Sequence, residues 1–70
     1  MKVIDVARLF CTKHVFDSTV CVVVNNEDSI FNPGDSLSDL GDLADKTVKH
    51  CYTEERVLFI EARERRENDT

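Results

Sequence analysis

One segment of this 70-residue chain restricts its fold more than any other: the run from Thr19 to Val24, which is β-branched or apolar at every position. Strands that face water on one side alternate apolar and polar residues, whereas strands covered on both faces are apolar throughout. The run therefore predicts a strand in the middle of a sheet. Val57-Leu-Phe-Ile60 is also apolar on both faces and predicts a second well-covered strand.

The first thirteen residues allow two interpretations. As a helix, they place Val3, Val6, Ala7 and Phe10 on one face and polar residues on the other. As a strand, they place Arg8 among apolar side chains, because side chains alternate between the two faces. The helix fits the pattern better, and residues 14–18 are then a connection to the first strand.

Turn residues separate the elements that follow. Asn25-Asn-Glu-Asp28 predicts a polar turn before a short strand over 29–31. Asn32-Pro-Gly-Asp35 has the residue order of a type II turn, because Pro fixes φ at the second position and Gly supplies a positive φ at the third. Asp35 or Ser36 can then cap an amphipathic helix whose leucines share one face.

The last two strands, over 47–53 and 56–63, are predicted to form a hairpin around Glu54-Glu55. The resulting order, α-β-β-α-β-β, predicts an α+β fold in which two short helices cover a sheet of about four mostly antiparallel strands. We expect a single domain over residues 1–63, followed by a charged, flexible tail over 64–70.

A chain of this size is marginally stable alone, because it buries only about 60% of the surface that it exposes when unfolded. Three cysteines are an odd number, and Cys21 lies inside an apolar run, which is typical of a buried, reduced thiol rather than a disulfide framework. Oligomerisation is then the favoured source of stability. Two short helices cover only one face of the sheet, so a homodimer contact is predicted on the other face, with Tyr52, Val57 and Phe59 as its candidates.

The charged residues are unevenly distributed along the chain. No lysine or arginine occurs between Lys13 and Lys46, and residues 14–45 hold seven carboxylates. A field of one sign attracts a basic surface and repels nucleic acid and membranes. A host protein with a basic groove is therefore predicted to bind Asp28, Asp35, Asp39, Asp42 and Asp45. The alternative is that these carboxylates form only the solvated face of a helix.

No catalytic or metal-binding motif is found in the sequence. An EF-hand loop beginning at Asp35 fails, because Leu37 and Leu40 occupy the positions of a ligand and of the required glycine. His50 and Cys51 are neighbours on a predicted strand and point to opposite faces, which disfavours a zinc site. A cysteine nucleophile needs a histidine beside it and a third group that orients the histidine, and nothing in the sequence places these together. We therefore expect neither an enzyme nor a cofactor.

A nucleotide-binding oligomer is the alternative function. The turn Asn32–Asp35 opens onto a helix N-terminus, where backbone N–H groups can receive a phosphate. Basic side chains would come from elsewhere, across an oligomer interface: Arg8, Lys46, Lys49, Arg56 and Arg63. Such a protein would be a sponge for a nucleotide second messenger. The simpler interpretation is that the turn only joins a strand to a helix.

The layout of residues 3–62 resembles that of small accessory proteins encoded by bacteriophages and prophages. The shared features are a leading amphipathic helix, an apolar strand, an Ile-Phe strand, a Leu/Asp-rich helix and a closing hairpin with Val57-Leu-Phe-Ile-Glu61. The resemblance implies an inhibitor of a host factor, such as an anti-CRISPR or other anti-defence protein. A structural subunit of a larger particle is a third interpretation.

Asp5 and Arg8 interrupt the first apolar residues, so we expect no signal peptide and a cytoplasmic protein.

Overall fold

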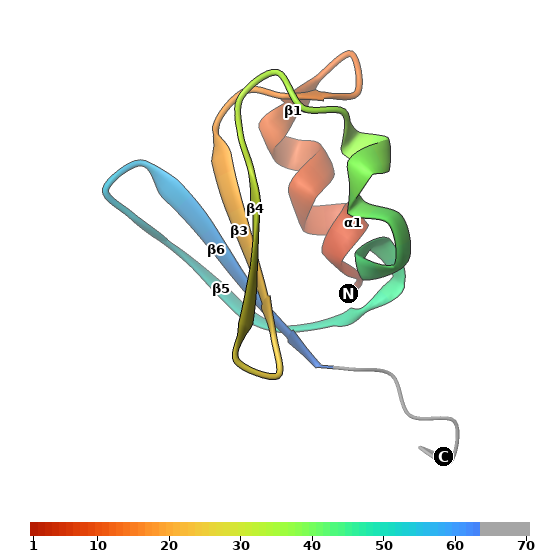
Figure 1. Cartoon of the computed structure of the whole chain (residues 1–70), viewed down its shortest axis with the longest axis vertical. Helices are drawn as coiled ribbons and strands as arrows, with labels where there is room; N and C mark the ends of the chain where they lie inside the picture. Colours follow the sequence, from red (N-terminus) through yellow and green to blue (C-terminus); the bar gives the residue numbers. More distant parts are fainter. Residues whose placement is uncertain (64–70) are drawn as a thin grey trace.

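Two β-hairpins form the main sheet of the protein, and they meet through their inner strands (Figure 1). The computed structural model describes residues 1–63. One hairpin joins β3 (Thr19–Val24) to β4 (Glu27–Phe31), and the other joins β5 (Thr47–Glu54) to β6 (Val57–Arg63). β3 and β6 lie side by side and run parallel, which gives the strand order β4-β3-β6-β5. The two apolar segments are therefore the central strands, and the predicted α+β class is confirmed.

The helices lie together on one face of this sheet (Figure 1). The chain begins with α1 (Val3–Ala7), which continues into the 3-10 turn η1 (Arg8–Phe10). A small hairpin of β1 (Cys11–Thr12) and β2 (Val15–Phe16) then leads into β3. The 3-10 segment η2 (Leu37–Asp45) connects β4 to β5 and packs beside α1.

The core lies between the helices and the covered face of the sheet. Alternation along the strands directs every second residue into it: Val20 and Val22 from β3, and Leu58, Ile60 and Ala62 from β6. The helical segments contribute buried aliphatic residues, and β2 and β4 contribute one phenylalanine each, whose rings are stacked with their centroids 5.5 Å apart: Val3, Val6, Ala7, Leu37, Leu40, Phe16 and Phe31.

The first segment is shorter than the predicted helix. The α-helix ends at Ala7 and the helical turns end at Phe10, after which Cys11 is already extended and begins a strand. Residues 14–18, predicted as a connection, include the strand β2. The helical interpretation therefore correctly predicted which residues of this segment face the core. The described residues form six strands instead of the predicted four, because β1 and β2 make an additional small hairpin.

The second helix differs from its prediction. Residues 37–45 form two 3-10 turns joined at Gly41, whose φ of 55° and ψ of −126° are not helical. Leu37 and Leu40, three residues apart on the first turn, match the 3.0 residues per turn of a 3-10 helix and are both buried. Leu43 follows the break at Gly41 and packs partly buried against the same core. The sequence pattern was therefore helical, but its period was closer to 3.0 than to 3.6.

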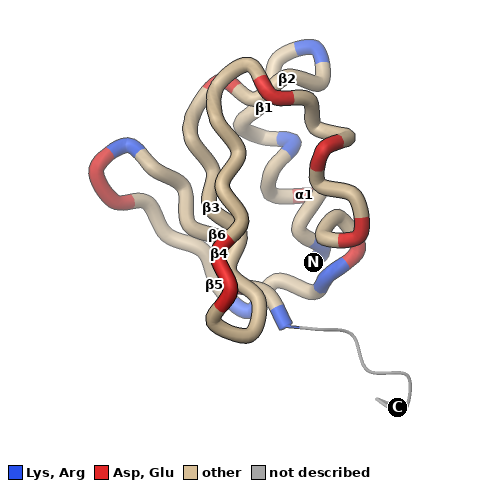
Figure 2. Tube along the Cα trace, viewed as in Figure 1, with Lys and Arg blue, Asp and Glu red and all other residues tan. Residues whose placement is uncertain are grey.

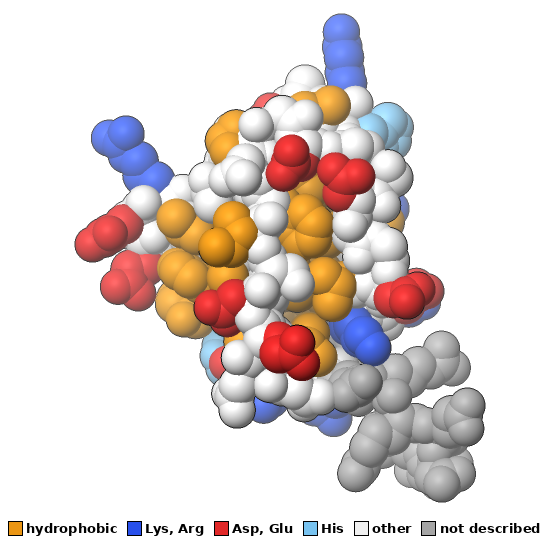
Figure 3. Space-filling model, in the orientation of Figure 1, with side chains coloured by type: hydrophobic (Ala, Val, Ile, Leu, Met, Phe, Trp, Pro, Cys, Tyr) orange, Lys and Arg blue, Asp and Glu red, His pale blue; other side chains and the backbone are white. Residues whose placement is uncertain are grey.

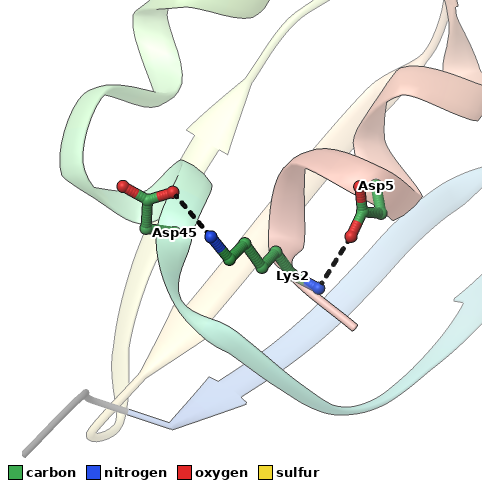
Figure 4. Close-up of polar contacts among 3 residues, drawn as sticks. All are labelled: Lys2, Asp5 and Asp45. Atoms are coloured by element: carbon green, nitrogen blue, oxygen red, sulfur yellow. Dashed lines mark hydrogen bonds and ion pairs between the residues drawn. The ribbon is translucent and has the colours of Figure 1, made fainter.

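The N-terminus is fastened to the far end of η2 (Figure 4). The Asp5 carboxylate accepts a hydrogen bond from the backbone N–H of Lys2 at 3.0 Å, which caps the first turn of α1. The ammonium group of Lys2 lies 3.5 Å from a carboxylate oxygen of Asp45. Backbone hydrogen bonds from Val3 N to Lys46 O and from Val48 N to Met1 O join the same two segments.

Three hairpins turn through two residues that both have positive φ, the geometry of a type I′ turn. The turns are Lys13-His14, Asn25-Asn26 and Glu55-Arg56. The predicted polar turn after β3 is thus confirmed over its first two residues, and the last hairpin turns one residue later than predicted. Asparagine tolerates this backbone, whereas Glu and Arg are strained in it.

The predicted tail, 64–70, lies outside the described residues.

Relief of this strain should stabilise the protein. Replacing Glu55-Arg56 by Asn-Gly is expected to raise the free energy of unfolding by roughly 1 kcal/mol, because both residues then accept positive φ. In a domain of this size that corresponds to an increase in Tm of about 4–8 °C, measured by circular dichroism. The control Asn26→Gly should change Tm less, because Asn already suits the turn. An unchanged or lower Tm for the Asn-Gly variant would contradict the strain.

Candidate interaction surfaces

The face of the sheet opposite the helices carries a row of apolar side chains that crosses all four strands of the sheet. Ile30 on β4 pairs with Cys21 on β3, Cys21 pairs with Phe59 on β6, and Phe59 pairs with Tyr52 on β5. We call these four residues the apolar row. None of them belongs to the core cluster, because they alternate with the buried residues of the same strands.

The apolar row is the centre of a larger surface. The next positions on the same side are half-buried Val23 and Val57, and charged or polar residues surround them. We call the whole set the open sheet face: Asp28, Ile30, Thr19, Cys21, Val23, Val57, Phe59, Glu61, His50, Tyr52 and Glu54. Figure 3 shows hydrophobic side chains gathered at this side of the molecule, between β4 and the tip of the β5–β6 hairpin.

The two ends of the apolar row are the most exposed. Ile30 is 60% exposed and Tyr52 is 49% exposed, whereas Cys21 in the middle is only 4% exposed because neighbouring strands flank it. The rings of Tyr52 and Phe59 are stacked with centroids 5.1 Å apart, and the imidazole of His50 stacks on Tyr52 at 6.1 Å. Stacked rings on paired strands form a rigid apolar surface.

A small ionic cluster lies beside this aromatic stack. One carboxylate oxygen of Glu61 is 3.2 Å from the Lys49 ammonium, and the other is 3.2 Å from Nε2 of His50. Lys49 is the extra residue where the pairing of β5 with β6 shifts register, so the bulge directs its side chain toward Glu61. All three side chains are substantially exposed, and such ion pairs contribute only about 0–1 kcal/mol.

The residues predicted to form an oligomer contact lie on this face. Val57, Phe59 and Tyr52 are all on the open sheet face, as their positions in β6 and β5 require. Sequence reasoning missed Ile30 and Cys21. Alternation identifies Ile30, because Phe31 beside it is buried in the core and the two must point to opposite faces.

The five predicted acidic residues are not brought together in one line. Figure 2 shows acidic positions at intervals along the chain that follows β4 and a separate acidic segment on β4 itself. By sequence, the first group is Asp35, Asp39, Asp42 and Asp45, and the second is Glu27 and Asp28. Asp28 belongs to the open sheet face, whereas η2 covers the other face. Gly41 also breaks η2, so Asp39 and Asp42 do not share the face of a regular helix.

Three of these carboxylates have structural partners. Asp35 accepts a hydrogen bond from Asn32 N at 2.7 Å, and Asp39 accepts one from Ser36 N at 3.2 Å. Asp45 pairs with Lys2. Among the described residues, the side chains of Asp42 and Asp28 take part in no hydrogen bond or ion pair. These two carboxylates are therefore the ones whose charge is open to a partner molecule.

The turn before η2 has no free backbone donors for a phosphate. Consecutive N–H groups from Gly34 to Asp39 all donate within the chain: those of Gly34, Asp35, Leu37 and Asp39 to backbone oxygens, and those of Ser36 and Ser38 to side chains. A hydrogen-bonded donor cannot bind an anion without losing its present partner. The turn therefore only joins β4 to η2, as the simpler interpretation predicted.

The basic residues named for a nucleotide site are dispersed within one chain. Arg56 is at the tip of the β5–β6 hairpin and Arg63 is at the other end of β6, about 20 Å away at the rise of a strand. Arg8 belongs to η1 in the helical layer. Lys46 and Lys49 lie near Arg63, because Thr47 pairs with that residue.

The described part of the chain contains no group of three or more His, Cys, Asp or Glu side chains that could hold a metal ion. Its three cysteines are free thiols. Burial raises the pKa of the Cys21 thiol above its ordinary value of 9.0, and the negative charge of Asp28 raises it further. Burial, followed by the charge of Asp17, likewise raises the pKa of Cys11, whose Sγ donates to Ala7 O at 3.3 Å.

Comparison with known proteins finds no match among protein families, curated proteins or solved structures. Within residues 1–63, none of the helices has the length and apolar content that crossing a lipid bilayer requires.

The buried thiols predict a loss of stability at high pH. As pH rises through 9, the thiols ionise in the unfolded chain before they ionise in the folded protein, so unfolding releases protons and becomes more favourable. Urea unfolding under reducing conditions at pH 8 to 10 should show the decrease. Cys21→Ala should reduce its slope. The control Val23→Ala removes packing on the same strand without a titrating group, so it should keep the wild-type slope; equal slopes for both variants would refute the assignment.

Proposed function

We propose that this protein is a non-catalytic binding domain that acts through its open sheet face. The observation that carries the proposal is the apolar row, in which Ile30, Cys21, Phe59 and Tyr52 form an uninterrupted apolar line across the sheet. Contiguous exposed apolar surface with a polar border is typical of a protein–protein interaction site. Burying the row in an interface would remove it from water.

The composition of the face supports a protein partner. Aromatic residues are enriched at the energetic centres of interfaces, where tyrosine contributes both ring area and a hydroxyl donor. Tyr52 and Phe59 are already stacked, so little side-chain freedom would be lost on binding. The charged residues Asp28, Glu61 and Lys49 lie beside this apolar centre, the usual position of polar groups at an interface border.

The proposal predicts that cross-links form from one face only. A photo-reactive amino acid at position 52 in cells that produce the protein should give a discrete covalent adduct of defined mass on irradiation. The same group at Leu9 is a matched control, because Leu9 is 79% exposed but belongs to η1 in the helical layer. Adducts should form from position 52 and be absent from position 9.

Mass spectrometry of the adduct identifies what occupies the face. No adduct from position 52, or equal adduct formation from both positions, would refute the proposed function. The variant Ile30→Ser, which removes an exposed side chain at the other end of the apolar row, should lower the yield from position 52 without unfolding the protein.

We propose, as a second function, that the acidic segment contacts a basic surface of a partner protein, as an inhibitor of a host factor would. The specific observation is that Asp42 and Asp28 have no ionic partner among the described residues, and that no lysine or arginine occurs between Lys13 and Lys46. Exposed charge of one sign accelerates association with an oppositely charged surface and is screened by salt.

This second function predicts that Asp42→Lys slows association with the partner by about tenfold at low ionic strength, with little effect at high salt. Surface plasmon resonance with the captured partner measures the rate. Glu55→Lys at the distant hairpin tip is the control of equal charge change and should alter the rate less. Asp39→Lys is unsuitable, because it also removes a helix cap. Equal effects of the two substitutions would contradict a localised acidic contact.

A further inference from the structure

We infer that a second copy of this chain covers the open sheet face and packs against it face to face. The two copies are related by a two-fold axis that lies between the two sheets, parallel to β3 and β6 and midway between these strands. The inference rests on the proposed function of this face and names its partner. Two sheets packed in this way lie about 10 Å apart, and their side chains interdigitate.

The apolar row is self-complementary under this symmetry. The axis reverses the strand order of the partner, so β4 lies over the partner's β5 and β3 over the partner's β6. Cys21 then meets the partner's Phe59, and Ile30 meets the partner's Tyr52. A small residue lies opposite a large ring at the centre, and an aliphatic residue opposite a ring at each end. Such pairs allow interdigitation without two large side chains in collision.

The charges of the neighbouring row agree with the same arrangement. In register, this row reads Asp28, Val23, Glu61 and His50 across the four strands, with Lys49 beside His50. Asp28 is at the β4 end of this row, and the ammonium group of Lys49 is at the β5 end, where it also pairs with Glu61. Reversal of the strand order places Asp28 against the partner's Lys49, and the contact occurs twice in each dimer.

The central strands require cover on this face. Strands that are apolar on both faces are typical of sheets covered on both sides, and Cys21, Val23, Val57 and Phe59 make β3 and β6 apolar on the face that α1 and η2 do not cover. Residues 64–70 contain Glu, Arg, Asn, Asp and Thr, and therefore no apolar side chain that could supply the second layer. Pairing through the edge of β5 is disfavoured, because the bulge at Lys49 interrupts the edge.

Charge exchange between chains provides the test. In sedimentation equilibrium, the wild-type protein should be a dimer. Asp28→Lys and Lys49→Glu should each weaken the dimer by about tenfold or more, because each places like charges at both contacts. An equimolar mixture of the two variants should recover the dimer, because both contacts of the mixed dimer are then between opposite charges. If Lys49→Glu acted only by breaking the Lys49–Glu61 pair within one chain, mixing the two variants would not restore the dimer.

The apolar contact is tested by a double-mutant cycle. Ile30→Ser and Tyr52→Ser should each weaken the dimer by about tenfold or more, and their effects should be non-additive, although β3 and β6 separate the two residues within one chain. Leu9→Ser is the control and should leave the dimer unchanged. Thermal unfolding verifies that each variant folds.

A monomer at all concentrations, a dimer insensitive to these substitutions, or a failure of the mixed variants to recover would each overturn the inference. The proposed function is judged separately by the adduct from position 52. An adduct with a different protein would uphold the binding role and refute the second copy. An adduct of two copies of this chain would support both.

Discussion

Burial of the two central strands is the requirement on which the rest of this structure depends. β3 is apolar on both sides, and so is β6 over Val57–Ile60, so the other elements are placed by how they cover or extend these two strands. The helices cover one side and produce the core. The outer strands β4 and β5 extend the sheet and leave the other side as a surface. The fold and the candidate site are therefore two faces of the same pair of strands.

The covering layer is thin, and it is held by contacts at its ends rather than by long helices. α1 has five residues and η2 is irregular, so neither has much helical stability of its own. The segment Met1–Val3 is instead hydrogen-bonded to Lys46–Val48, and Leu37 N donates to His14 O at the opposite end. These backbone contacts fix both helical segments over the sheet, where their aliphatic side chains complete the core.

The sequence predicted the elements that follow simple periodicity. The bounds of Thr19–Val24 and the two-sided character of Val57–Ile60 follow from β-branched, apolar residues alone. The parallel pairing of these strands was not predictable, because it depends on how the helices dock. The 3-10 geometry of η2 and the turn at Glu55-Arg56 were also missed, since leucines three residues apart fit both helix types and neither turn residue favours positive φ. Tyr52, Val57 and Phe59 of the candidate site were found, whereas Cys21 and Ile30 were missed; Ile30 follows from alternation once Phe31 is known to point into the core.

The parallel pairing of β3 with β6 also determines the order in which this protein can fold. Thr19 pairs with Val57, so the ladder joins residues 38 positions apart, whereas each hairpin is joined by a turn of two residues. Hairpins form in about 1–10 μs, while distant strands must first close the intervening chain. The inner edges of both hairpins therefore remain unpaired during that interval. The rate at which the connection through η2 brings the two hairpins together decides whether those edges meet each other or the edges of another chain.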